Sequence, residues 1–290
     1  MPRRVSRLCF AALGAATLLS ATRPAAAQDL DALRAKYLLP INDVGSVVSP
    51  GGFFRGAPGT NSGSPLAFGP SWGDAFVGAG YQSATRGVKD PVTSVMSANG
   101  TNDGSVSAGM GFGDARDAIG LEAVVTTLST VRSGFFNRTA FSFKVHRMLD
   151  NTSALALGVE NAFIAGGQKT DGTASVYAVA SKVFFLPENS TGLFKAATFS
   201  AGLGNGRFRF INDIINDRST VTFFGAGSVM VNDMFSAIAD WTGTDLNLGV
   251  SIVPFKQFPV VFTPSIADVT QTASKSARFL LGVGIGMHFN

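Results

Sequence analysis

Cysteine, histidine and charged residues are scarce in this chain. It has 290 residues, with one cysteine, two histidines and only 14% charged side chains. The single cysteine, Cys9, lies in an N-terminal segment that we expect to be removed, so the mature chain has neither a disulfide framework nor thiol chemistry. The sequence also lacks the motifs of a phosphate-binding loop, a zinc protease, an EF-hand and a paired-cysteine metal site. We therefore expect no cofactor and no bound metal.

The first 27 residues have the features of a cleaved signal peptide. Three arginines fall within the first seven residues, an apolar stretch covers 8–21, and three alanines at 25–27 form the cleavage site. Four of the 23 basic residues and none of the 19 acidic residues lie in this segment, which leaves 19 of each in the mature chain. The formal charge of +4 thus belongs to the export signal and does not indicate a nucleic-acid partner.

Long hydrophobic runs are absent beyond the signal peptide. The mean hydropathy is nevertheless +0.25, and no apolar run approaches the ~18 residues of a membrane helix. A hydrophobic, exported chain without membrane helices is explained by alternating strands whose apolar faces meet lipid.

The clearest alternating pattern covers residues 278–290. Large apolar residues occupy every second position from Phe279 to Phe289, and mostly glycine or polar residues lie between them. A period of two over about a dozen residues predicts a β-strand with two different faces, longer than most soluble strands. It resembles the closing strand of bacterial outer-membrane β-barrels, although Asn290 follows the last aromatic residue. The resemblance implies that this strand meets the barrel insertion machinery and that outer-membrane lipid surrounds the protein.

Twelve strand candidates follow Trp72. They cover 73–85, 104–113, 119–130, 137–149, 153–164, 174–185, 195–204, 220–231, 234–241, 245–255, 259–269 and 278–290. The even number, and connections that are mostly long after odd strands and short after even ones, favour an all-β fold: a transmembrane antiparallel up-and-down β-barrel. A soluble β-sandwich is the alternative. Pro264 lacks the N–H that a strand ladder needs, so we expect a bulge or a shorter strand there.

The predicted organisation has three parts. The signal peptide covers 1–27, a short N-terminal helix with an irregular segment covers 28–72, and the barrel covers 73–290. Residues 41–72 are rich in glycine, proline, serine and asparagine and show no sustained period. We expect them to lie in the periplasm or to fold back into the barrel as a plug.

Most charged strand residues fall on the face opposite the apolar one, which places them in the lumen. The candidates are Glu122, Lys144, His146, Glu160, Lys182, Asp240, Asp245 and Arg278. They form either a polar constriction that selects solutes by charge or an ion-paired filling of a closed barrel. Asp240 and Asp245 face each other across a short link. They either bind a cation or pair with Arg207 or Arg209.

Aromatic residues lie near both predicted membrane boundaries, where amphipathic rings anchor a barrel. At the inner boundary we place Trp72, Phe255, Phe258 and Phe289; at the outer boundary we place Tyr81, Tyr177, Trp241 and Phe279.

The sequence does not predict an enzyme. Ser142 and His146 share one face of a strand but lie about 13 Å apart, too far for a nucleophile and its base. Three short stretches, FKVHR (143–147), GVEN (158–161) and GLGNGRFR (202–209), are similar to segments of YjbH-like barrels linked to exopolysaccharide secretion. We expect a narrow, weakly selective outer-membrane channel for small polar solutes. The alternatives are a non-conducting structural or secretion-accessory barrel and a soluble secreted β-protein.

Overall fold

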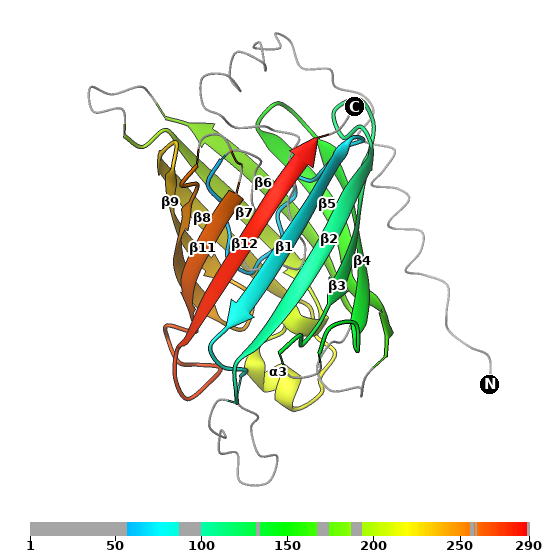
Figure 1. Ribbon diagram of the computed structural model, residues 1–290, viewed down its shortest axis with the longest axis vertical. Helices are drawn as coiled ribbons and strands as arrows, with labels where there is room; N and C mark the ends of the chain where they lie inside the picture. Colours follow the sequence, from blue (N-terminus) through cyan, green and yellow to red (C-terminus); the bar gives the residue numbers. More distant parts are fainter. Residues whose placement is uncertain are drawn as a thin grey trace, which may run out of the picture.

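Twelve antiparallel strands close into a barrel in the computed structural model (Figure 1). The structure describes residues 57–86, 100–131, 134–166, 174–186, 193–255, 258 and 260–288. The strands are β1 (Asp74–Gln82), β2 (Asp103–Gly113), β3 (Gly120–Thr127), β4 (Thr139–Met148), β5 (Ser153–Ala165), β6 (Ser175–Phe185), β7 (Ala196–Gly204), β8 (Thr222–Asn232), β9 (Phe235–Trp241), β10 (Leu246–Ile252), β11 (Val260–Ala267) and β12 (Arg278–His288). The predicted fold class and strand number are confirmed. The predicted signal peptide and N-terminal helix lie outside the described residues.

Each strand pairs with its neighbours in sequence, and β12 pairs with β1 to close the barrel. Closure gives the backbone N–H and C=O groups on both edges of β12 hydrogen-bond partners, so that no edge strand is left unpaired. Two of the three glycines of its inner row meet glycines of β1: Gly284 lies opposite Gly78, and Gly282 lies opposite Gly80, whereas the third lies opposite Phe76. At these two glycine pairs the inner wall therefore carries no side chains.

The two faces of the wall differ in chemistry. Inward-facing residues are buried and mostly small or polar, whereas large apolar side chains are exposed on the outside. Representative exposed residues are Val77, Val125, Leu157, Phe163, Phe199, Phe223 and Leu248. Large apolar side chains therefore lie on the outer surface of the barrel, whereas a soluble protein buries most of them.

The two ends of the barrel also differ. At one end, here called the terminal end, β1 begins, β12 ends, and short turns such as 149–152 join neighbouring strands; it is uppermost in Figure 1. The opposite loop end has longer connections, and one of them holds η1 (Gly206–Phe208) and α3 (Ile211–Ile215). No helix in the described part of the chain is long and apolar enough to cross a membrane.

Pro264 does not produce the predicted bulge. Gly249 pairs with Ser265 and Ile252 pairs with Phe262, so the register between β10 and β11 is the same on both sides of the proline. Because Pro264 has no N–H to donate, the ladder opens locally and then resumes. The other predicted alternative is confirmed, because β11 covers Val260–Ala267 and is shorter than the candidate range of 259–269. Register shifts occur instead between β4 and β5 and between β8 and β9.

Candidate functional site

The lumen holds a stretch of the chain itself. Residues 57–71, which we call the inner segment, are all buried except the half-buried Gly63, and they appear as blue coil within the barrel in Figure 1. The segment reads APGTNSGSPLAFGPS and has no charged side chain. Its backbone groups must therefore find hydrogen-bond partners on the barrel wall.

The inner segment is bound near the terminal end at Gly59. The Gly59 N–H donates to the Ser251 hydroxyl at 2.7 Å, and the Ser236 hydroxyl donates to the Gly59 carbonyl. Ser236 is the second residue of β9 and Ser251 the sixth of β10. Since β9 begins and β10 ends at the terminal end, both contacts lie near that end.

The segment then reaches the loop end, where residues 61–64 form its tip. The backbone N–H groups of Ser62 and Ser64 donate to Asp240 Oδ2 at 2.7 and 3.0 Å, and the Ser64 hydroxyl donates to Asp240 Oδ1. A Cβ on Gly63 would lie 2.8 Å from Thr242 Cγ2, so the tip packs closely against the short link between β9 and β10. Asp240 is the residue that fixes the tip.

From the tip the segment returns towards the terminal end along the opposite wall. The Ala67 N–H donates to the Ser181 hydroxyl at 2.9 Å, and the Lys144 ammonium donates to the Phe68 carbonyl at 2.9 Å. The Ser71 N–H donates to Asp74 at the start of β1. The inner segment is therefore a re-entrant loop that occupies the length of the lumen.

Three of the predicted lumenal residues form a cluster on β3 and β4. Glu122 lies directly opposite Lys144, and their side chains form an ion pair of 2.6 Å with at most 1% of either exposed. His146 lies two residues further along β4 and is also buried, against Gly120. The cation that neutralises Glu122 therefore belongs to the barrel wall itself.

Glu160 has a partner that comes from outside the strands. Arg207, in η1, donates to both carboxylate oxygens of Glu160 and also to the Gly63 carbonyl at 2.9 Å. Its guanidinium lies 4.3 Å from the ring of Phe208. A single arginine thus connects the loop end, the wall and the tip of the inner segment.

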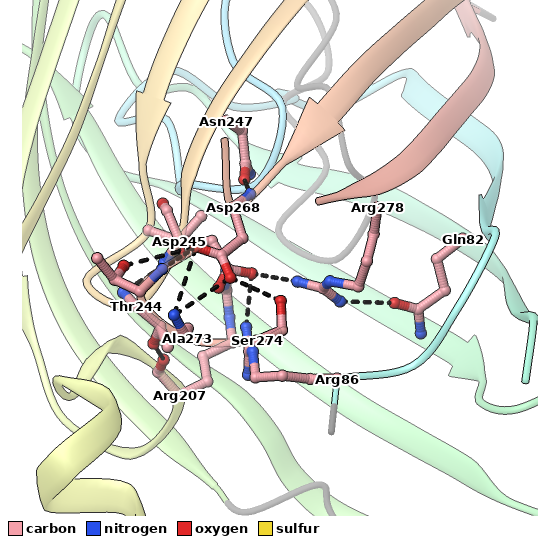
Figure 2. A network of polar contacts seen from close by, with 12 residues as sticks. Gln82, Arg86, Arg207, Thr244, Asp245, Asn247, Asp268, Ala273, Ser274 and Arg278 are labelled. Carbon is pink, nitrogen blue, oxygen red and sulfur yellow. Dashed lines mark hydrogen bonds and ion pairs between the residues drawn. The ribbon is translucent and has the colours of Figure 1, made fainter. Parts of the chain in front are cut away.

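Asp245 is the centre of a second network at the loop end (Figure 2). Arg86 donates to Asp245 Oδ2 at 2.7 Å, and Arg278 donates to the same oxygen. Arg278 also donates to the Gln82 side chain at 3.2 Å. Asp268, nearby, accepts from backbone N–H groups of its own loop, including Thr272 at 2.9 Å. These contacts join β1, β10 and β12 across the mouth.

The predicted pairing of Asp240 and Asp245 with Arg207 or Arg209 is wrong. Arg207 makes its ion pair with Glu160, Arg209 lies 4.0 Å from Asp217, and Asp245 pairs with two other arginines. In the described part of the chain, no group of three or more histidine, cysteine or acidic side chains is placed to hold a metal.

Two predictions on β6 are wrong for one reason. Lys182 was assigned to the lumen, but it lies on the outer face and donates to the Ser153 hydroxyl at 2.7 Å. Tyr177 was assigned to the outer boundary, but it is buried in the lumen against Phe208 and Phe224. Because alternate residues face opposite sides, a one-residue error in phase reverses every assignment on a strand.

The other aromatic residues lie at the ends of the wall. Trp72, Phe255 and Phe258 are exposed at the terminal end, and Tyr81 and Phe279 are exposed at the loop end. Trp241 is half-buried at the loop end, where its ring packs near Phe210 and Phe223. Phe289 lies outside the described residues.

Sequence reasoning did not identify Arg86 or the individual residues of the inner segment. Arg86 lies in a connection beyond β1, where no strand pattern indicates which way a side chain points. The inner segment carries one usable signal, a run of fifteen uncharged residues from 57 to 71 with small side chains at most positions. Such a composition suits a backbone that must approach a wall closely.

Neither a protein-family model nor a curated protein matches the sequence. Among solved structures, the chain is similar to an outer membrane channel from Pseudomonas putida F1, with 11% identity and a TM-score of 0.43 over 75% of this chain and 96% of that one. It is also similar to the outer membrane protein Omp33 from Acinetobacter baumannii, with 7% identity and a TM-score of 0.38 over 74% of this chain and 98% of that one. The barrel topology itself stands on the strand pairing described above.

Proposed function

We propose that this chain is a narrow, weakly selective outer-membrane channel for small polar solutes, and that the inner segment closes it in the structure described here. The observation that carries the proposal is the largely polar inner wall, along which a separate stretch of chain, the inner segment, lies and makes hydrogen bonds. A wall of this kind stays compatible with water when the inner segment moves away.

The outer surface supports a membrane location. Exposed apolar side chains surround the barrel, and aromatic residues lie at both ends of it. Such a surface is stable in lipid and would aggregate in water. In this proposal β12 completes the barrel during insertion and carries the signal that the insertion machinery reads.

The inner wall supports a channel. Its buried residues include many with small hydroxyl side chains: Ser107, Thr126, Ser142, Ser175, Ser181, Thr198, Ser200, Ser228, Ser236, Ser251, Thr263 and Ser265. A barrel that is filled permanently by its own residues favours large branched side chains. Small hydroxyl side chains leave room and offer hydrogen bonds to water or solutes. The mixed signs of the charged groups favour weak selectivity.

A non-conducting barrel with a permanent plug is the second candidate. The buried hydrogen bonds along the inner segment favour it, since each must break before the segment can move. A role accessory to polysaccharide secretion, suggested by the similarity of residues 143–147 and two other short stretches to YjbH-like barrels, stays a prediction.

Planar-bilayer recordings distinguish the two candidates. The purified full-length protein, checked for a heat-modifiable folded form, should show intermittent openings. A variant that lacks residues 57–71 and passes the same check should show larger and longer openings. If neither protein conducts, the channel proposal is wrong. If the protein fractionates as a soluble species without detergent, the membrane location is wrong as well.

A further inference from the structure

Asp240 has an unusual position among the acidic residues of the wall. It is fully buried, and the residues directly opposite it on the neighbouring strands are Asn247 on β10 and Ala226 on β8. It makes no ion pair with any described residue within 4 Å. A buried carboxylate needs hydrogen-bond donors, and the three that the described residues supply all come from the tip of the inner segment.

The tip also satisfies a donor on the facing side. Arg207 holds Glu160 with two hydrogen bonds and gives a third to the carbonyl of Gly63. When the tip leaves, Asp240 loses its three donors and Arg207 loses one acceptor. The vacated place then offers the Asp240 carboxylate and one free N–H of the Arg207 guanidinium. Together with Glu160, these groups carry a net charge of −1.

We infer, building on the proposed channel function, that the tip is an internal substitute for a solute. The wall site formed by Asp240 and Arg207 binds a small cationic amine that also carries a hydroxyl group, such as a protonated amino alcohol. Its ammonium takes the place of the Ser62 and Ser64 donors on Asp240. Its hydroxyl oxygen accepts from Arg207, in the place of the Gly63 carbonyl.

The charge of the site decides between solute classes. An anion is repelled by the net charge of −1, and a neutral diol offers donors without neutralising the carboxylate. A simple alkylammonium ion pairs with Asp240 but leaves the Arg207 donor unsatisfied. The Arg207 side chain is 35% exposed, so a solute can reach it from the loop end.

Two other buried acidic residues, Glu122 and Asp245, do not offer such a site. Glu122 is paired with Lys144, and Asp245 is shared by Arg86 and Arg278. Each of these carboxylates keeps its cations when the inner segment moves, because its partners belong to strands or to their connections. Asp240 alone among these three depends on the segment.

The test compares two full-length variants that weaken the tip in different ways. Ser64→Ala removes one donor from the tip and leaves the wall site intact, whereas Asp240→Asn removes the charge of the site. Both should open more often than the unmodified channel. Ethanolammonium chloride, added on the loop-end side, should block the open Ser64→Ala channel, with ethylammonium and glycerol binding more weakly because each lacks one of the two groups.

In Asp240→Asn, the concentration of ethanolammonium that gives half block should rise about tenfold or more, as expected for the loss of a charge-assisted hydrogen bond. Asp150→Asn, combined with Ser64→Ala, is the control: it removes an exposed carboxylate from the turn 149–152 at the terminal end, far from the site, and should leave the block within about twofold, the scatter expected for distant sites. Equal block of the Ser64→Ala and Asp240→Asn channels would overturn the inference while leaving the channel function in place.

A second measurement does not require conduction. Titration calorimetry of the Ser64→Ala protein in detergent micelles should detect ethanolammonium binding that Asp240→Asn abolishes. Binding without any openings would retain the site and overturn the channel. Absence of both binding and block would overturn the site.

Discussion

Glu122 and Asp240 are both buried carboxylates on the inner wall, yet they are satisfied in opposite ways. Glu122 faces Lys144 across one strand pair, so the wall neutralises it. Asp240 faces neutral residues on both sides and depends on the tip of the inner segment. The carboxylate in the middle of the β3–β4 wall therefore keeps its cation without the inner segment. The carboxylate at the loop end has its hydrogen-bond donors only when the inner segment is in place. We expect movement to begin at the loop end.

The largest effect should follow from removing the cation of the fixed pair. Lys144→Met removes the cation that neutralises the buried Glu122 carboxylate and should lower the free energy of unfolding by about 3–5 kcal/mol. Urea unfolding in detergent micelles measures this change. Lys182→Met, on the outer face, is the control and should cost at most about 1 kcal/mol. Similar losses in the two variants would show that the Glu122–Lys144 pair is not as buried as described.

Asp240→Asn should have a smaller effect on unfolding and a large effect on opening. The amide keeps the shape and one acceptor oxygen, but its hydrogen bonds to the tip lose the assistance of a charge. A loss of about 1.5 kcal/mol in tip binding corresponds to roughly a tenfold rise in the ratio of open to closed time. Single-channel recording measures that ratio. An unchanged ratio would mean that Asp240 does not fix the closed position.

Tyr177→Phe should be neutral or slightly stabilising. The Tyr177 hydroxyl is buried and has no hydrogen-bond partner among the described residues, so its removal relieves a desolvation cost and should raise the free energy of unfolding by up to about 1 kcal/mol. Tyr177→Leu removes the ring contacts with Phe208 and Phe224 and should be clearly destabilising, by at least about 1 kcal/mol. Destabilisation of equal size in both variants would indicate a partner for the hydroxyl.

The smallest effect concerns acid stability at the terminal end. Burial raises the pKa of Asp150, in the turn between β4 and β5, but hydrogen bonds from Thr152 and Ser153 and the charge of Lys182 outweigh it and lower the pKa below its ordinary value. A lowered carboxyl pKa stabilises the folded state above about pH 4, and this contribution disappears as the pH falls through the folded pKa. Since Asp150 is 43% exposed, the contribution should stay well below about 1 kcal/mol.

Unfolding of the unmodified protein and Asp150→Asn at pH 7 and pH 3 checks this sign. The difference between the two proteins should shrink at pH 3. A difference that grows on acidification would contradict it.

The two faces of most strands were predictable from the sequence. In stretches such as β12 every second residue is large and apolar, and these residues lie on the outer face of the barrel. Lys182 and Tyr177 show where this fails: β6 has small residues at many positions, so its phase is ambiguous. The partner of Asp240 was not predictable. The inner segment has no period, and its contacts depend on backbone groups that every residue shares.

The central claim, that the tip of the inner segment closes the channel at the loop end, is tested most directly by a reversible crosslink. A Cβ on Gly63 lies 2.8 Å from Thr242 Cγ2, one bond from the Thr242 Cβ, which suits the roughly 3.5–4.5 Å between the Cβ atoms of a disulfide. The predicted mature chain has no other cysteine, because Cys9 lies in the predicted signal peptide. The single variants Gly63→Cys and Thr242→Cys serve as controls. The oxidised Gly63→Cys/Thr242→Cys protein should be silent in planar bilayers, and dithiothreitol should restore its openings; equal currents before and after reduction would contradict the account.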